Sequence, residues 1–141
     1  MKIAATIARL LLGLMFLVFG LNDFLHFIPM GTMPPGPAGE FAGLLIATHY
    51  MNAVGLVMVI SGALLLVNRY VPLGLVLLGP VLVNILLFHI LMAPKGIATG
   101  AFATLLWLLT AYRVRSAFRG LFQQITFKRD GGQGISAPHI K

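Results

Sequence analysis

The chain contains no cysteine and very few charged residues. Of its 141 residues, 9% are charged, only three are acidic and 59% are hydrophobic, and the mean hydropathy is +0.97. Without cysteine there can be no disulfide framework, thiolate metal ligand or thiol redox centre. A water-soluble domain of this size needs much more polar surface. The composition therefore predicts an all-helical protein that crosses a membrane several times.

Apolar stretches are long enough for four membrane spans. A bilayer core of about 30 Å requires about 20 residues of helix, and the run from Pro72 to Pro94 meets this requirement. The N-terminus begins like a signal peptide, but its apolar run continues to Phe27 with no small-residue cleavage site, so we expect it to be retained. The sequence predicts a four-helix transmembrane bundle with spans at residues 3–27, 49–67, 72–92 and 97–115.

The connection between the first two spans, residues 28–48, contains both a loop and an expected short helix. Pro and Gly are dense from Pro29 to Glu40, which indicates a loop. The apolar sequence that follows is too long for one perpendicular crossing. We therefore expect a short interfacial helix carrying Glu40 and Phe41, with the second span beginning near His49. Small residues in that span, Gly55 and Gly62 among them, permit close helix approach in lipid.

Basic residues predict the orientation. The net charge is +7, but Lys and Arg stand at the ends of apolar segments, which favours contact with lipid headgroups and argues against nucleic acid as a partner. With the N-terminus inside, nine of the ten Lys and Arg residues lie inside and only Lys95 lies outside. The positive-inside rule then predicts cytoplasmic termini, a cytoplasmic tail at residues 120–141 and, in a bacterium, residence in the inner membrane.

Polar side chains gather at the outer ends of the predicted spans. Ionisable residues inside a membrane are functional candidates by default, because lipid offers them no hydrogen-bond partners. The alternatives are ordinary ones: an interfacial ion pair for Asp23 with His26, or hydrogen bonds between helices for the amides. We predict Asp23, His26 and His89 as catalytic residues, and as substrate-binding residues Asn22, His49, Asn52 and the deeper Asn84.

Three kinds of chemistry fit this set. Three histidines and Asp23 could bind a divalent metal such as Zn²⁺, although no two of them have the spacing of adjacent ligands. A histidine pair could ligate haem. A quinone entering from the outer leaflet is the most favoured option, because a protonatable histidine backed by a carboxylate can deliver protons to it. The sequence contains no flavin or dinucleotide fingerprint, so a partner or a haem would have to supply the electrons.

Two segments, ARLLLGLMFLVFGLNDFLHF and PLGLVLLGPVLVNILLFHILMAP, resemble the DoxX family of small bacterial four-helix membrane proteins. The resemblance runs from Ala8 to about Tyr112 and rests on Gly13 and Gly20 in the first segment and on Pro80, Asn84 and His89 in the second. It implies a quinone-linked role, because the family is named for a membrane subunit associated with thiosulfate:quinone oxidoreductase. Asn22 and Asp23 replace the lysine-containing end that is more usual in the first span.

A role without catalysis is the alternative. The small size, the short loops and the basic tail suit an accessory subunit of a larger membrane complex, with other membrane subunits as partners. A transporter is a third class, but four spans provide little material for alternating access in one chain.

Overall fold

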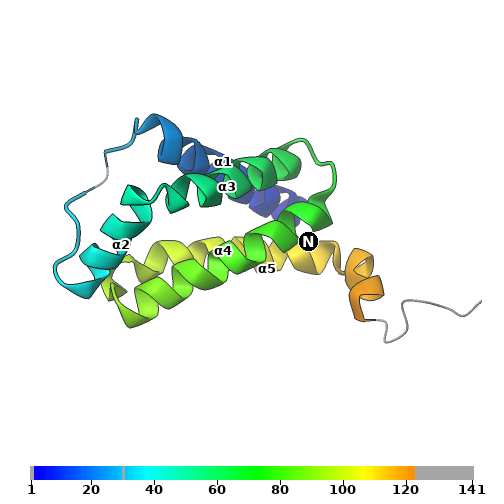
Figure 1. Cartoon of the computed structure of the whole chain (residues 1–141). Coiled ribbons are helices and arrows are strands. Elements are labelled where there is room, and N and C mark those ends of the chain that lie inside the picture. The colour runs from blue at the N-terminus through cyan, green and yellow to red at the C-terminus, as the bar shows by residue number, and fades with distance from the viewer. Residues whose placement is uncertain (1, 30, 123–141) are drawn as a thin grey trace, which may run out of the picture.

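The computed structural model describes residues 2–29 and 31–122, which form helices and loops with no strand among them (Figure 1). Five α-helices and two short 3₁₀ helices follow one another along the chain: α1 (Lys2–Leu25), α2 (Pro37–Ala47), α3 (Tyr50–Leu66), α4 (Val71–Leu91), η1 (Pro94–Gly96), α5 (Ile97–Arg113) and η2 (Arg115–Phe122). The four predicted spans correspond closely to α1, α3, α4 and α5. The all-helical prediction is confirmed for this part of the chain.

Two helices are long and apolar enough to cross a membrane. They are α1, with 24 residues, and α4, with 21 residues. Helices α2 and α3 meet the same requirement only as a pair, and they are bent by 78° at the break between them. The structure therefore contains two candidate membrane spans, or three if the bent pair forms one. Large apolar side chains are exposed along α1, α3, α4 and α5, as expected of helices that contact lipid.

The break between α2 and α3 lies where the sequence predicts it. Helix α2 begins at Pro37, a residue suited to a first helical turn. It ends at Thr48, whose Oγ1 donates a hydrogen bond to the Leu44 carbonyl over 2.8 Å. His49 then adopts a left-handed conformation with φ 58°, and α3 begins in a new direction. The separate short helix is confirmed, and its location at a membrane interface stays a prediction.

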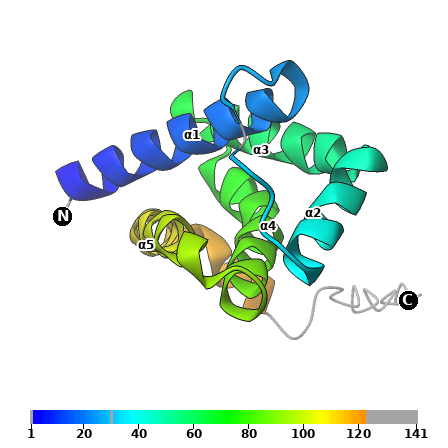
Figure 2. The same cartoon turned by 90° about the vertical axis from the view of Figure 1, so that its left-hand side faces the viewer.

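The four long helices pack in a ring. Helix α1 contacts α3 and α5, and α4 contacts the same two helices from the other side. Figure 2 shows α5 nearly end-on while α1 runs across the view, so these two neighbours cross at a large angle. The core is built from apolar side chains of all four helices: Ala8, Leu12, Phe16, Met58, Leu65, Val71, Leu75, Leu78, Leu82, Ala103 and Leu106.

Helices α1 and α3 touch backbone to backbone. A Cβ atom added to Gly62 would lie 2.7 Å from the Gly13 carbonyl oxygen, and one added to Gly20 would lie 2.7 Å from the Gly55 carbonyl oxygen. The glycines are seven residues apart on each helix, and they pair in antiparallel order. Only glycine permits this approach, so the expectation of close helix packing is confirmed.

Helix α5 ends earlier than the sequence suggests. The sequence predicts a helical span over residues 97–115, but the α-helix stops at Arg113 and a 3₁₀ helix follows from Arg115. The Val114 N–H is shared between the carbonyls of Thr110 and Ala111, at 3.3 and 3.1 Å, which tightens the last turn. The expectation was wrong because 3₁₀ geometry at a helix end is set by such local bonds and not by apolar periodicity.

The glycine contact generates a stability prediction. Gly62→Ala should lower the free energy of unfolding by about 1–3 kcal/mol, because the added methyl group meets backbone atoms that cannot move aside. The measurement is the thermal unfolding midpoint of the purified protein in detergent. Gly79→Ala is the matched control, since its nearest heavy atom would be Trp107 Cζ2 at 4.0 Å. Equal midpoints for the two variants would contradict the prediction.

Candidate functional site

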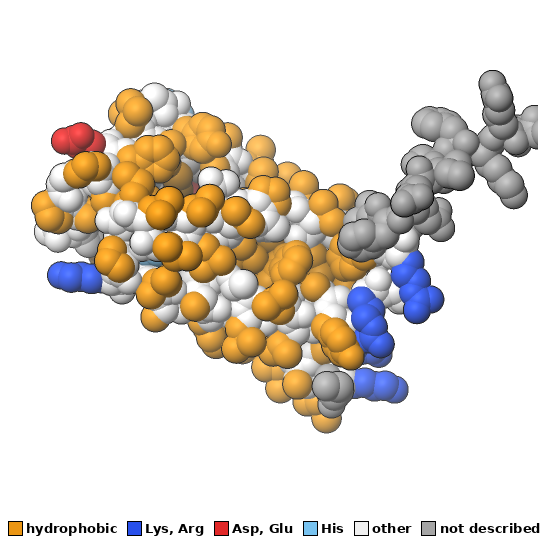
Figure 3. All heavy atoms as spheres, turned by 90° about the horizontal axis from the view of Figure 1, so that it is seen from below, with side chains coloured by type: hydrophobic (Ala, Val, Ile, Leu, Met, Phe, Trp, Pro, Cys, Tyr) orange, Lys and Arg blue, Asp and Glu red, His pale blue; other side chains and the backbone are white. Residues whose placement is uncertain are grey.

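Among the described residues, two kinds of polar group lie at opposite ends of the four long helices. The histidine end comprises Asn22, Asp23, His26, His49 and His89, together with α2 and η1. The basic end comprises Arg9, Arg69 and Arg113, with the start of α1 and the link between α3 and α4. Figure 3 shows Lys and Arg gathered at the basic end and a broad apolar surface between the two ends. The prediction that the polar residues of different spans share one end agrees with this topology.

Asp23 lies at the contact between α1 and α3. A Cβ atom on Gly55 would come within 2.8 Å of both Cβ and Oδ2 of Asp23, so the carboxyl group rests on the glycine backbone. Oδ2 is buried and accepts no hydrogen bond from any described residue. A buried polar atom without a partner is rare in proteins and costs about 1–3 kcal/mol. Asp23 is therefore the least satisfied polar group at the histidine end.

His26 is the first residue after helix α1, which ends at Leu25. It has a left-handed φ of 52°. Its backbone N–H still bonds to the Asn22 carbonyl at 2.9 Å, and its side chain is exposed. Three-residue spacing predicts a shared face only while the helix continues, so helix periodicity does not fix the position of His26 relative to Asp23.

Asn22 holds the loop that follows α1. Its Oδ1 accepts a hydrogen bond from the Ile28 N–H at 2.6 Å, and its amide donates to the Ile28 carbonyl at 3.3 Å. The side chain is 7% exposed. Both polar atoms are thus used within the protein, which gives Asn22 a structural role in addition to the substrate-binding role predicted for it.

His89 is fitted into the turn between α4 and α5. Its Nδ1 lies 2.8 Å from the Ile85 carbonyl oxygen, which can only accept, so Nδ1 carries the proton. Its Nε2 occupies the space where a side chain on Gly96 would stand. The ring also meets Phe88 edge to face, and Phe88 stacks on Phe41 of α2 with ring centroids 6.2 Å apart. These contacts join α2 to the end of α4 and make His89 part of that junction.

The remaining predicted residues lie apart from these. His49 is exposed in the bend before α3, and its carbonyl accepts the Asn52 N–H at 3.1 Å. Asn84 is exposed and donates to the Pro80 carbonyl of its own helix at 2.9 Å. It therefore does not form the hydrogen bond to a neighbouring helix that we expected of it. Within residues 2–29 and 31–122 no three His, Asp or Glu side chains come together as metal ligands.

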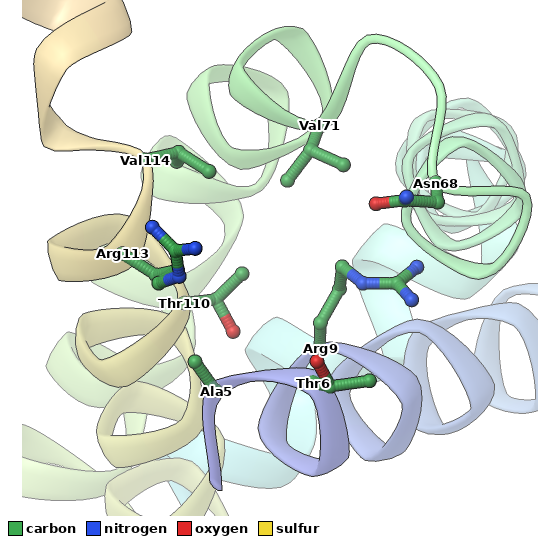
Figure 4. Close-up of a pocket in the computed structure, with 8 residues that line it drawn as sticks. All are labelled: Ala5, Thr6, Arg9, Asn68, Val71, Thr110, Arg113 and Val114. Carbon is green, nitrogen blue, oxygen red and sulfur yellow. The ribbon is translucent and has the colours of Figure 1, made fainter. Parts of the chain in front are cut away.

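A cavity at the basic end could not be predicted from the sequence. Arg9 and Arg113, interpreted as membrane-surface anchors, line a cavity of about 350 Å³ between α1, α5 and the link from α3 to α4 (Figure 4). Arg9 donates through Nη1 to the carbonyls of Leu65 and Leu66 at the end of α3. The sequence did contain one indication of this site: Arg9 stands two turns inside an apolar helix. An ionisable residue in that position is a functional candidate.

Comparison with models of protein families, with curated proteins and with solved structures found no match to this chain. The resemblance to the DoxX family stays a prediction.

The two asparagines provide a test of the histidine end. Asn22→Ala should lower the free energy of unfolding by about 1–3 kcal/mol, because both backbone groups of Ile28 lose their partner in a buried place. Asn84→Ala should change it by less than about 0.5 kcal/mol, because that side chain is exposed and bonds only to its own helix. Thermal unfolding in detergent and hydrogen exchange at the Ile28 amide measure the difference. If hydrogen exchange at the Ile28 amide is as slow in Asn22→Ala as in Asn84→Ala, the structural role of Asn22 is refuted.

Proposed function

We propose that this protein is a four-span membrane protein that acts as a quinone-linked redox component at the histidine end, as the resemblance to the DoxX family implies. The observation that carries the proposal is Asp23, whose buried Oδ2 has no hydrogen-bond partner in the described part of the chain. Asp23 is half-buried, and a buried carboxyl oxygen without a hydrogen-bond partner is costly. Such groups are typically kept where they exchange protons with a substrate.

Four spans are supported by the lengths and surfaces of the helices. Besides α1 and α4, helices α3 and α5 have 17 residues each, which corresponds to about 26 Å at 1.5 Å per residue. Both expose apolar side chains, including Leu56 and Leu105. Local thinning of the bilayer and snorkelling of flanking residues accommodate helices of this length. Exposed apolar side chains on all four helices of the ring suit lipid on every side.

The positive-inside rule supports the orientation. Six of the seven Lys and Arg residues between residues 2 and 119 lie at the basic end, and Lys95 alone lies at the histidine end. In this proposal the basic end, with the N-terminus and the tail, faces the cytoplasm of a bacterium. The histidine end then lies in the periplasmic leaflet of the inner membrane, where quinones are accessible.

The proposed chemistry is proton exchange with the quinone. Reduction of a quinone to a quinol takes up two electrons and two protons, and oxidation releases them. In this proposal Asp23 and His26 exchange protons at the water boundary, and His49 and Asn52 donate hydrogen bonds to a quinone carbonyl. The electrons come from a partner protein in the membrane. A divalent metal is less favoured, because residues 2–29 and 31–122 form no group of three His, Asp or Glu side chains.

An accessory subunit without catalysis is the second candidate. It is favoured by the hydrogen bonds that hold Asn22 and His89 inside the protein, because side chains with internal partners behave as structural contacts. In this candidate the exposed apolar surface contacts other subunits as well as lipid. Loss of partner association without loss of a redox rate would identify it.

The role of Asp23 can be tested in membranes of the native host. Asp23→Asn keeps the size of the side chain but removes its ability to exchange a proton, so quinone turnover should fall by about 100-fold or more. Glu40→Gln is the control, because it removes an exposed acidic group from the same end of the protein. Rates are compared in vesicles with equal amounts of each variant.

Native mass spectrometry of the gently extracted protein shows whether a quinone is bound and whether Asp23→Asn releases it. Equal quinone turnover by Asp23→Asn and Glu40→Gln, together with no added quinone mass on the wild-type protein, would refute the redox role. It would favour the role of an accessory subunit.

A further inference from the structure

We propose that the cavity at the basic end, which is lined by Arg9, Arg113 and Asn68, binds a phosphate group. This cavity lies at the opposite end from Asp23, so the inference does not depend on the redox role. Figure 4 shows Arg9 and Arg113 on opposite sides of the cavity, with Asn68 beside Arg9. Arg9 belongs to α1, Arg113 to the last turn of α5 and Asn68 to the link between α3 and α4, so three elements build the site.

The charge in the cavity is not neutralised from within the described part of the chain. The acidic residues in residues 2–29 and 31–122 are Asp23 and Glu40, and both belong to the far end of the helices. Two cations that line one cavity repel each other, and no acidic residue in the described part of the chain lies near them to offset this. An anion in the cavity would remove this cost.

The hydrogen-bonding groups of the cavity match a ligand that only accepts. The hydroxyls of Thr6 and Thr110 donate to carbonyls of their own helices, at 3.0 and 2.8 Å. Arg9 uses Nη1 for α3, which leaves Nε and Nη2 as donors. Arg113 and Asn68 donate no side-chain hydrogen bond to a described residue. Most of the available groups are therefore donors, from the two guanidinium groups and the Asn68 amide, and phosphate oxygens accept hydrogen bonds from guanidinium groups in pairs.

The size and position of the cavity agree with a phosphate-bearing ligand. Its volume of about 350 Å³ lies in the range of about 300–1,000 Å³ that small-molecule sites occupy. Ala5, Val71 and Val114 provide its apolar wall. Basic pockets between spans on the cytoplasmic side of a membrane bind the headgroups of acidic phospholipids. A soluble phosphate compound has the same chemistry, and the experiment below separates these two sources.

The test measures binding of two probes to the full-length protein purified in detergent and stripped of lipid. Phosphatidylglycerol represents the acidic headgroup, with phosphatidylcholine as its zwitterionic reference, and inorganic phosphate represents a soluble ligand. Arg113→Gln should weaken binding of the effective probe by about tenfold or more, because a charge-assisted hydrogen bond is lost. Arg113→Lys keeps the charge and should lose less.

Arg115→Gln is the matched control. It removes one positive charge from the same end, but Arg115 packs over the Tyr112 ring at 4.4 Å and does not line the cavity. Its binding of the effective probe should stay within about twofold of wild type, since a rim charge away from the site contributes little at physiological salt. The variant also reports any general effect of net charge on lipid or phosphate binding.

Each outcome decides the inference. A loss confined to phosphatidylglycerol identifies a lipid headgroup, and a loss confined to inorganic phosphate identifies a soluble ligand. Equal affinities of Arg113→Gln and Arg115→Gln for both probes would overturn the proposal, as would equal binding of phosphatidylglycerol and phosphatidylcholine together with no binding of phosphate. Arg113 is exposed, so its replacement should leave the fold intact, and the thermal midpoint of each variant verifies this.

Discussion

The backbone contact between α1 and α3 determines where the charged groups of the protein lie. Lipid provides no hydrophobic force that drives helices together, so close van der Waals packing becomes the main attraction between spans. The glycines at Gly13 and Gly20 meet those at Gly62 and Gly55, and any shift along the helices would press side chains against backbone. With this register fixed, Arg9 reaches the last carbonyls of α3, and Asp23 comes to rest on Gly55.

The same register separates the charges. Arg9 is placed at the C-terminal end of α3, where the helix dipole and the unpaired carbonyls favour a cation. Asp23 lies at the other end of α1, with most of an apolar span between the two side chains. In the described residues neither charge can therefore serve as the counterion of the other. With so few acidic residues among those described, the basic groups are satisfied by carbonyls, as for Arg9, or by solvent or a bound anion.

Features that depend on local sequence could be predicted, and features that depend on a neighbouring helix could not. The four long helices, the break near His49 and the close approach of small residues follow from apolar length, from Pro and Gly, and from residue size. The position of His26 could not be predicted, because its left-handed backbone ends α1 at Leu25, two residues before the predicted end of the span. His89 depends on the empty space at Gly96, and Arg9 depends on carbonyls of another helix. The sequence contains the residues for these contacts but not the register that brings them together.

The unsatisfied state of Asp23 is a consequence of the packing itself. The Asp23 carboxyl group is covered by α3 because Gly55 has no side chain to keep it out. The surface it meets is helical backbone, whose N–H groups already bond within α3, so it offers no donor to the carboxyl oxygen. A larger residue at position 55 would force the carboxyl toward water and remove the cost. The contact between Asp23 and Gly55 is therefore unfavourable as a direct result of how α1 and α3 pack. A contact of this kind persists when the group serves a purpose other than stability, which is the physical reason to seek the chemistry of this protein at Asp23.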